Sequence, residues 1–221
     1  TSGGFTTYDD HPGNAEAFSL ANTPALTISP LAGKTIFWLG SSVTYGFGSH
    51  GEAVADFVAK RNGCTCYKEA VSGTTLLAPT MTPAFDQFYA SYKMVFQNVS
   101  FLSLGASPAD PLAAQLMSMD ATEAADRLAA LSYVRRLDNL PHDVQPDLFV
   151  LQSSTNDTRW LSEGAEPATG GFDPAAFKTH VTLDALQWII ANVRERWGCP
   201  VLVYTSPLLD DDRYRAQVRG T

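Results

Sequence analysis

Three short, continuous apolar segments constrain the fold of this chain more than any other feature of its sequence. Residues 36–39 (IFWL), 148–151 (LFVL) and 201–204 (VLVY) are each entered through Gly, Asp or Pro and left through small polar residues. Runs this short, with no polar alternation, are typical of strands covered on both faces, as in a parallel sheet. Residues 65–71 predict a weaker fourth strand.

The segments between these strands carry signals for helices. Two capping-box patterns predict helix starts, Ser49 with Glu52 and Asp120 with Glu123. A longer helix is expected to begin at Asp173-Pro174 and to stop at Gly198, because large apolar residues recur between them every three or four positions. Strands alternating with helices predict an α/β fold, a three-layer α/β/α sandwich of the flavodoxin-like kind around a parallel sheet.

The length of 221 residues fits one domain with a single core. Residues 1–33 are rich in Gly, Thr, Pro and Asn with little periodicity, which predicts an N-terminal arm lying over a domain formed by residues 34–221. No apolar run approaches the roughly 18 residues of a membrane span, and the first ten residues lack the pattern of a secretory signal.

The charge of the chain narrows the range of its partners. A net charge of -8 and a pI near 4.8 oppose binding to nucleic acid and to acidic membrane surfaces. The three cysteines, Cys64, Cys66 and Cys199, lack zinc-site spacing and are interpreted as buried thiols. Unpaired thiols favour the cytoplasm, although removal of a signal peptide would also allow a secreted protein. No metal ion or organic cofactor is expected.

Small polar segments follow the predicted strands at the edge where ligands bind in parallel sheets. Ser42 lies in a tight turn between Gly40 and Gly46, where a hydroxyl nucleophile would be exposed and backbone N–H groups could face the oxyanion it generates. Gly73 ends the second strand, and Asn156 follows the third, where its amide would add an oxyanion donor. Each alone also fits an ordinary turn. Their occurrence after three strands favours one site.

These segments resemble the sequence blocks of the SGNH (GDSL) hydrolases. Residues 40–46 (GSSVTYG) are similar to the G-D-S-x-T-x-G first block, residues 71–75 (VSGTT) to the second, and residues 154–157 (STND) to the G-x-N-D third block. The resemblance covers roughly residues 34–205. It implies an SGNH-type α/β fold, Ser42 as the nucleophile, and an oxyanion hole formed by the Ser42 and Gly73 N–H groups and the Asn156 amide.

The chain departs from the family pattern at three places. Ser41 replaces the usual Asp, and Ser154 replaces a Gly, both without loss of a proton-transfer group. The family's D-x-x-H block, which implies the general base and its orienting acid, does not occur after Tyr204. A helix, a fifth strand and this loop would need roughly 40 more residues. We therefore expect the base beyond residue 221, with residues 208–219 opening a polar helix.

None of the four histidines is a convincing base from the sequence. His11 lies in the arm, and His142 precedes a strand at the amino edge of the sheet. His50 is expected at the first position of a helix, where the helix dipole disfavours an imidazolium. His180 is interpreted as a partly buried structural residue of the long helix, with a role as base kept as an alternative.

An insertion relative to the family pattern spans about residues 78–119. It is rich in large apolar residues, which a solvated loop would not tolerate. We expect it either to cap the Ser42 edge and line an acyl pocket, or to extend the core or a dimer contact.

The sequence therefore predicts a hydrolase of carboxylic esters that acts through an acyl-enzyme on a small-molecule substrate. An acetylated sugar, a lipid and other small esters are left unranked. The alternative is a catalytically inactive GDSL-like domain that binds a carbohydrate or a partner protein. A homo-oligomer, or a complex with a C-terminal fragment of the same protein, is a further expectation.

Overall fold

The computed structural model describes residues 12–83, 85–87, 89, 90, 93, 111–157 and 182–205. The strands are β1 (Thr35–Gly40), β2 (Thr65–Ala70), β3 (Leu148–Ser153) and β4 (Val201–Thr205). The helices are α1 (Ser42–Tyr45), α2 (Val54–Asn62), α4 (Pro111–Ser118), α5 (Ala121–Ala130), α6 (Tyr133–Arg136) and α8 (Thr182–Trp197). Short 3-10 turns are η1 (Pro12–Asn14), η2 (Glu16–Phe18) and η4 (Leu137–Asn139).

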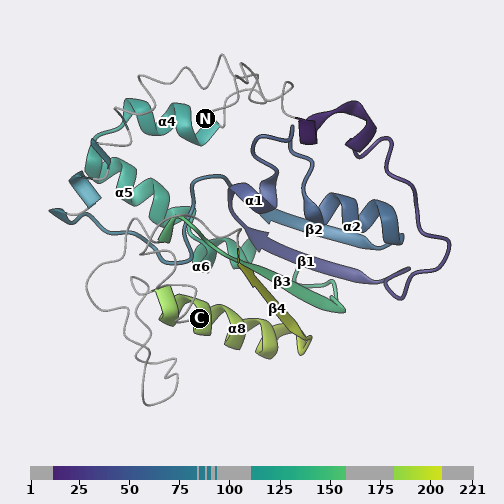
Figure 1. Cartoon of the computed structure of the whole chain (residues 1–221). Coiled ribbons are helices and arrows are strands. Elements are labelled where there is room, and N and C mark those ends of the chain that lie inside the picture. Colours follow the sequence, from purple (N-terminus) through teal and green to yellow (C-terminus); the bar gives the residue numbers. More distant parts are fainter. Residues whose placement is uncertain are drawn as a thin grey trace.

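The four strands form one parallel sheet in the order β2-β1-β3-β4 (Figure 1). The register places Ile36 of the central strand β1 between Cys66 on one side and Leu148 on the other. Because all strands run in the same direction, their carboxyl ends meet at one edge of the sheet. The structure confirms the predicted α/β fold with a parallel sheet, and each of the four predicted strands forms.

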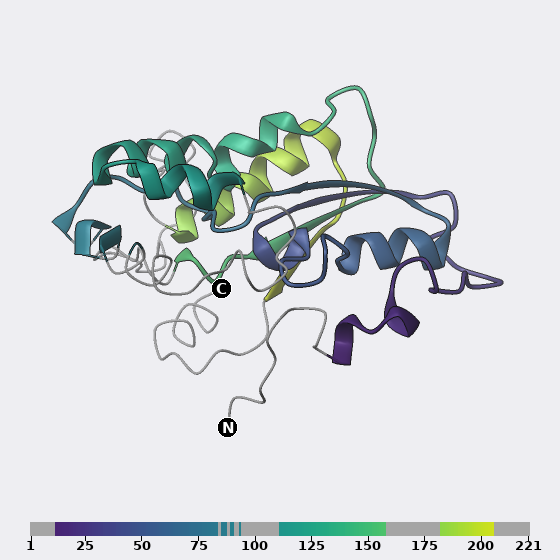
Figure 2. The same cartoon turned by 90° about the horizontal axis from the view of Figure 1, so that it is seen from above.

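Helices cover both faces of this sheet, giving three layers. Helices α1 and α2 lie on one face, and α6 and α8 lie on the other (Figure 2). Along β1, Phe37 and Leu39 join the apolar core under α6 and α8, whereas Ile36 and Trp38 pack on the α2 side. Successive side chains of a strand point to opposite faces, so a strand buried on both faces needs apolar residues throughout. This requirement explains the continuous apolar run.

Two of the predicted helix ends are confirmed. Asp120 caps α5, since its Oδ1 accepts the Glu123 N–H at 2.8 Å while the Asp120 N–H donates to Glu123 Oε2 at 3.0 Å. Gly198 ends α8 with φ of +60°. Its N–H donates to the Arg194 carbonyl at 3.0 Å. The left-handed conformation, which glycine adopts without steric cost, is the usual stop for a helix.

The predicted capping box of Ser49 and Glu52 is wrong. Helix α2 begins at Val54, and the Ala53 N–H donates to Asp56 Oδ2 at 2.8 Å. Ser49 Oγ instead donates to the backbone carbonyls of Gly46 and Glu52, at 3.0 and 2.7 Å. Its hydroxyl therefore closes a turn before the helix. The local pattern resembled a cap, but tertiary contacts and turn geometry decided the outcome.

The N-terminal segment from residue 12 to residue 33 runs along α2 and the loop before it. Five hydrogen bonds attach it there: Asn14 Nδ2 to Gly48 O at 2.6 Å, Leu20 N to Glu52 Oε2 at 2.7 Å, Leu26 N to Arg61 O at 2.7 Å, Ser29 Oγ to Asn62 Oδ1 at 2.7 Å, and Gly33 N to Gly63 O at 2.8 Å. These contacts join the segment to the β1–β2 half of the sheet. The first eleven residues of the predicted arm lie outside the described part of the chain.

A second apolar cluster contains much of the described part of the 78–119 insertion. Its buried members are Phe85, Tyr89, Leu112, Leu116, Ala124, Ala125 and Leu128. Val71, directly after β2, packs against the cluster. Helices α4 and α5 accordingly extend beyond the sheet on the side of its carboxyl ends (Figure 1). That the insertion covers Ser42 stays a prediction, because residues 94–110 lie outside the described part.

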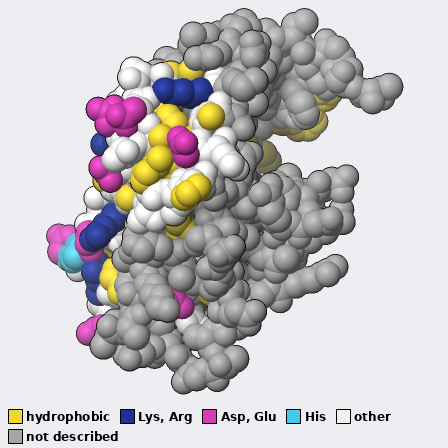
Figure 3. Space-filling view, turned by 90° about the vertical axis from the view of Figure 1, so that its left-hand side faces the viewer, with side chains coloured by type: hydrophobic (Ala, Val, Ile, Leu, Met, Phe, Trp, Pro, Cys, Tyr) yellow, Lys and Arg dark blue, Asp and Glu magenta, His cyan; other side chains and the backbone are white. Residues whose placement is uncertain are grey.

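The face beside α4 and α5 carries apolar, acidic and basic side chains interspersed among the described residues (Figure 3). Across the described ranges, no helix has the length and apolarity needed to cross a membrane. Cys199 is buried and Cys64 and Cys66 are partly buried, and all three are free thiols. The helix start at Asp173-Pro174 and the helix expected over residues 208–219 fall outside the described residues.

Candidate active site

Ser42 is the first residue of α1, a single helical turn that directly follows β1. Ser41 is its N-cap, and the turn ends at Gly46, whose φ is +92° and whose N–H donates to the Ser42 carbonyl at 3.0 Å. The Ser42 side chain is half-buried. We call residues 40–46 the Ser42 turn. Its helix has four residues, so the N-terminal dipole available at Ser42 is that of a single helical turn.

Gly40 is required by contact with Thr44. A Cβ atom on Gly40 would lie 1.9 Å from Thr44 Oγ1 and 2.8 Å from Gln152 Oε1. Both distances are below van der Waals contact, so a side chain here would displace the hydroxyl of Thr44. The first glycine and the threonine of the motif therefore form one packing unit.

Gln152 of β3 holds the Ser42 turn from the neighbouring strand. Its Oε1 accepts the Ser41 N–H at 2.9 Å, the Thr44 N–H at 3.3 Å and the Thr44 hydroxyl at 2.7 Å. The Gln152 side chain is fully buried. Thr44 Oγ1 also lies 2.7 Å from the hydroxyl of Tyr204 in β4. The turn is thus attached to both strands on one side of β1.

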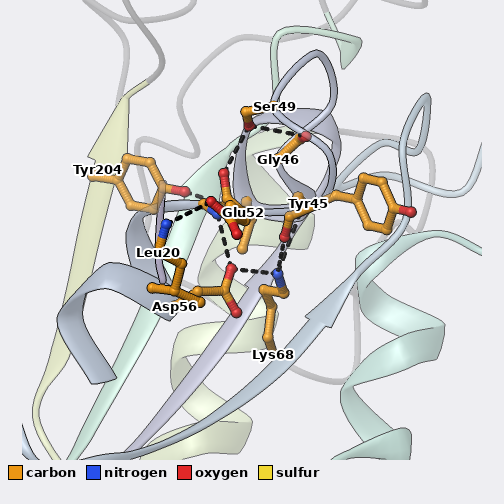
Figure 4. A network of polar contacts seen from close by, with 11 residues as sticks. Leu20, Tyr45, Gly46, Ser49, Glu52, Asp56, Lys68 and Tyr204 are labelled. Carbon is orange, nitrogen blue, oxygen red and sulfur yellow. Dashed lines mark hydrogen bonds and ion pairs between the residues drawn. The ribbon is translucent and has the colours of Figure 1, made fainter. Parts of the chain in front are cut away.

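Lys68 of β2 holds the chain that leaves this turn (Figure 4). Its ammonium group donates to the carbonyls of Tyr45 and Gly51, at 3.3 and 2.9 Å, and to Asp56 Oδ2 at 2.6 Å. A Cβ atom on Gly46 would lie 2.8–2.9 Å from backbone atoms of the returning chain. The loop therefore folds closely back on the end of α1, with one cation satisfying its carbonyl groups.

The second predicted segment, residues 71–75, is the first part of a loop over residues 71–78 that we call the Gly73 loop. Gly73 has φ of +82°, a conformation that favours glycine. The Asn156 amide donates to the Thr74 carbonyl at 2.8 Å, and Ser154 Oγ donates to the same oxygen at 3.0 Å. The structure therefore brings Asn156 into contact with the residue that follows Gly73. An amide nitrogen carries two hydrogens, of which this bond uses one.

A buried arginine joins the Gly73 loop to the end of β1. Arg136 Nη2 donates to the Gly40 carbonyl at 2.8 Å and to Thr74 Oγ1 at 2.9 Å. Its Nη1 lies 3.1 Å from Glu69 Oε1, and only 2% of the arginine side chain is exposed. The carboxylate of Glu69 balances the buried charge, as a buried guanidinium requires.

Asp157 anchors the far end of the Gly73 loop. Its carboxylate accepts the N–H groups of Leu76 and Leu77, at 2.9 and 3.2 Å, and the Thr182 hydroxyl at 3.2 Å. Burial raises the pKa of Asp157 to about 6, while these hydrogen bonds act in the opposite direction. The Asp157 carboxylate, next to Asn156 in the sequence, is thus occupied by hydrogen bonds to the backbone of the Gly73 loop and to Thr182.

The two described histidines differ in position. His142 lies at the amino edge, where its ring is 6.4 Å from that of Trp197, as expected for a residue away from the site. His50 is exposed and occupies a turn with φ of +55°, so its predicted place at the first position of a helix is wrong. The argument from the helix dipole therefore does not apply to His50. His11 and His180 lie outside the described residues.

Sequence reasoning missed the residues that hold the site together. Gln152 is a polar residue directly after the continuous apolar run of β3, and Arg136 is one of two adjacent arginines in a short helix. The polar residue at the end of a buried strand was an available signal. The pairing of Arg136 with Glu69 depends on tertiary structure and had no local signal. The described residues hold no cluster of three or more metal-ligating side chains.

The chain is only distantly similar to proteins of known structure. No protein-family model matches the chain, and no curated protein matches it. One solved structure is 16% identical, with a TM-score of 0.46 over 87% of this chain and 74% of that one. A candidate GDSL-like lipase from Bacteroides uniformis is 13% identical, with a TM-score of 0.44 over 85% of this chain and 78% of its own. At these values the likenesses do not bear on activity.

Proposed function

We propose that this chain is a GDSL-type serine hydrolase that cleaves carboxylic esters. One observation carries the proposal. Arg136 binds both the Gly40 carbonyl and the Thr74 hydroxyl, and Asn156 binds the Thr74 carbonyl. The segments that carry the nucleophile and the oxyanion donors therefore meet at the carboxyl edge of the sheet, where ligands bind in parallel α/β folds.

In the proposed reaction the Ser42 hydroxyl attacks the acyl carbon of the ester. The former carbonyl oxygen becomes an oxyanion, which receives hydrogen bonds from the Ser42 and Gly73 N–H groups and the Asn156 amide. A general base takes the Ser42 proton and returns it to the leaving alcohol. Water then attacks the acyl-enzyme and releases the acid.

The general base is the one part of this reaction without an assigned residue. The resemblance to the family implies an Asp-x-x-His pair, a pattern that does not occur between Tyr204 and Thr221, and His180 is the alternative within the sequence. His50 is a further candidate for the general base, because it lies in the loop that folds back on α1 and not at the start of a helix. Separate His50→Ala and His180→Ala variants assign or eliminate each histidine by their effect on kcat.

The central test is hydrolysis of a p-nitrophenyl ester by the wild type and by Ser42→Ala. We expect Ser42→Ala to abolish hydrolysis, and Asn156→Ala to lower kcat by about a hundredfold, as for the loss of one oxyanion donor. Ser49→Ala is the matched control, because this hydroxyl lies in the same loop and only bonds backbone carbonyls.

Labelling with a fluorophosphonate, followed by peptide mapping, identifies the reactive serine directly. We expect the label on Ser42. Retained hydrolysis in Ser42→Ala, or a label on another serine, would refute the assignment. A wild type that neither hydrolyses esters nor takes the label would favour the inactive, ligand-binding alternative.

A further inference from the structure

Helix α1 is not capped by the side chain at its own N-cap position. Ser41 occupies the N-cap position but its side chain makes no capping hydrogen bond. In most helices the N-cap side chain accepts the N–H of the second or third helical residue, which here is Val43 or Thr44. The Thr44 N–H donates instead to Gln152 Oε1, from the adjacent strand β3.

Gln152 therefore supplies a helix cap from another part of the sheet. The same oxygen accepts the Ser41 N–H at 2.9 Å. It thus binds the backbone on both sides of Ser42. The Ser42 N–H takes part in no hydrogen bond with the described residues. This division leaves the Ser42 N–H for an oxyanion while its neighbours are fixed.

The hydrogen bonds that reach Gln152 have a defined direction. A threonine hydroxyl has one hydrogen, and Thr44 gives it to Gln152 Oε1, which can only accept. Tyr204 must then donate to Thr44 Oγ1. Burial raises the pKa of Tyr204, so it keeps this proton at neutral pH. Two successive hydrogen bonds, donated from Tyr204 to Thr44 and from Thr44 to Gln152, thus hold the turn.

We propose that Gln152 is a positioning residue of the reaction. Its side-chain oxygen fixes the Ser42 turn so that the Ser42 hydroxyl and N–H face the same ester group. This inference rests on the proposed ester hydrolysis. The role belongs to the acceptor oxygen and not to the volume of the side chain, because the Ser41 N–H, the Thr44 N–H and the Thr44 hydroxyl all donate to that oxygen.

Two substitutions at Gln152 separate the oxygen from the volume. Gln152→Leu keeps the approximate size and removes the acceptor, whereas Gln152→Glu keeps an acceptor at the same length. Gln187→Leu is the matched control in the same domain, because within the described residues the buried Gln187 Oε1 has no hydrogen-bond partner. Steady-state hydrolysis of a p-nitrophenyl ester gives kcat and KM for each variant.

We expect Gln152→Leu to lower kcat by about a hundredfold with KM changed less than about threefold, because misplacement of a reacting group by 1 Å has an effect of this size. Gln152→Glu should recover most of this loss, and Gln187→Leu should resemble the wild type. A kcat for Gln152→Leu within about twofold of the wild type would overturn the inference. So would equal losses in Gln152→Leu and Gln152→Glu.

Amide hydrogen exchange tests the same inference by a measurement that does not depend on ester hydrolysis. The Ser41 and Thr44 amides should exchange faster in Gln152→Leu, while amides in β1 and α8 keep their wild-type rates. If the wild type proves inactive, the proposed function fails. Exchange then decides whether Gln152 fixes the turn, and unchanged rates at both amides would refute it. If Gln152→Leu does not fold, Gln152→Asn, which withdraws the oxygen by one methylene, is judged by the same criteria.

Discussion

The Ser42 turn and the Gly73 loop lie at the same edge of the sheet but are held by different chemistry. Neutral groups hold the middle of the Ser42 turn, through the Gln152 oxygen and the hydroxyls of Thr44 and Tyr204, whereas Arg136 and Lys68 bind only the carbonyls at its two ends. Ionisable groups hold the Gly73 loop, through Arg136 at its start and Asp157 at its end. The neutral contacts do not titrate near pH 7. We therefore expect changes of charge and pH to act on the Gly73 loop more than on the Ser42 turn.

The largest effect on stability is expected from Arg136→Met. This change leaves the Glu69 carboxylate, the Gly40 carbonyl and the Thr74 hydroxyl without their shared donor. Breaking a buried ion pair costs on the order of 3 to 5 kcal/mol in the free energy of unfolding, measured by urea denaturation. Arg127→Met, at an exposed position of α5, is the matched control. A loss below about 1 kcal/mol, typical of surface pairs, would remove the contrast between the two segments.

The next effect is a dependence on pH that Asp157 contributes. In the folded chain burial raises the pKa of this carboxyl to about 6, from an ordinary value of 3.8. Between these values the folded state keeps a proton that the unfolded state has released, so the contribution of Asp157 to stability falls as the pH rises from about 4 to about 6. Between these two pKa values the free energy of unfolding falls by on the order of 1.4 kcal/mol per pH unit.

Asp157→Asn removes this titration. The free energy of unfolding of the variant, minus that of the wild type, is measured by urea denaturation at pH 4 and at pH 7. We expect this difference to be more favourable to the variant at pH 7, by on the order of 2 to 3 kcal/mol. The exposed Asp126→Asn should show no such shift. A difference between Asp157→Asn and the wild type that stays constant with pH would show that the carboxyl does not titrate in this range.

The smallest effects on stability distinguish the glycines of the two segments. Gly40→Ala brings a methyl group against Thr44 and Gln152, and overpacking of this kind costs about 1–3 kcal/mol. Gly73→Ala meets no atom within 4 Å but keeps a left-handed φ, which costs roughly 1–2 kcal/mol. Thermal denaturation checks both values.

A second substitution reports the origin of each cost. Thr44→Ala should relieve part of the loss in Gly40→Ala, because it removes the hydroxyl with which the new methyl group would overlap. The same change should not affect the loss in Gly73→Ala. Additive effects of Thr44→Ala and Gly40→Ala would contradict the packing unit described for the Ser42 turn.

The sequence predicted β1 and β3 well because these two central strands are buried on both faces. An apolar run such as residues 36–39 needs no tertiary information to be recognised, and parallel strands place their exits at one edge. The contact of Asn156 with Thr74 follows from that rule. The capping box at Ser49 failed because positive φ angles at His50 and Gly51 keep the chain in a turn. The acceptor from Gln152 joins positions 108 and 111 residues apart, which no local pattern records.

The central position of β1 has a consequence for how the chain assembles. Its pairing with β2 spans only the short segment that contains α1 and α2, whereas the Thr35 N–H reaches the Asp147 carboxylate across 112 positions. Contacts that close long segments lose more chain entropy and form later in folding. The β1-α2-β2 unit is therefore expected to form first, with the Ser42 turn completed when β3 arrives. Because each doubling of a closed loop costs only about 0.6 kcal/mol, material added between β2 and β3 delays this step little.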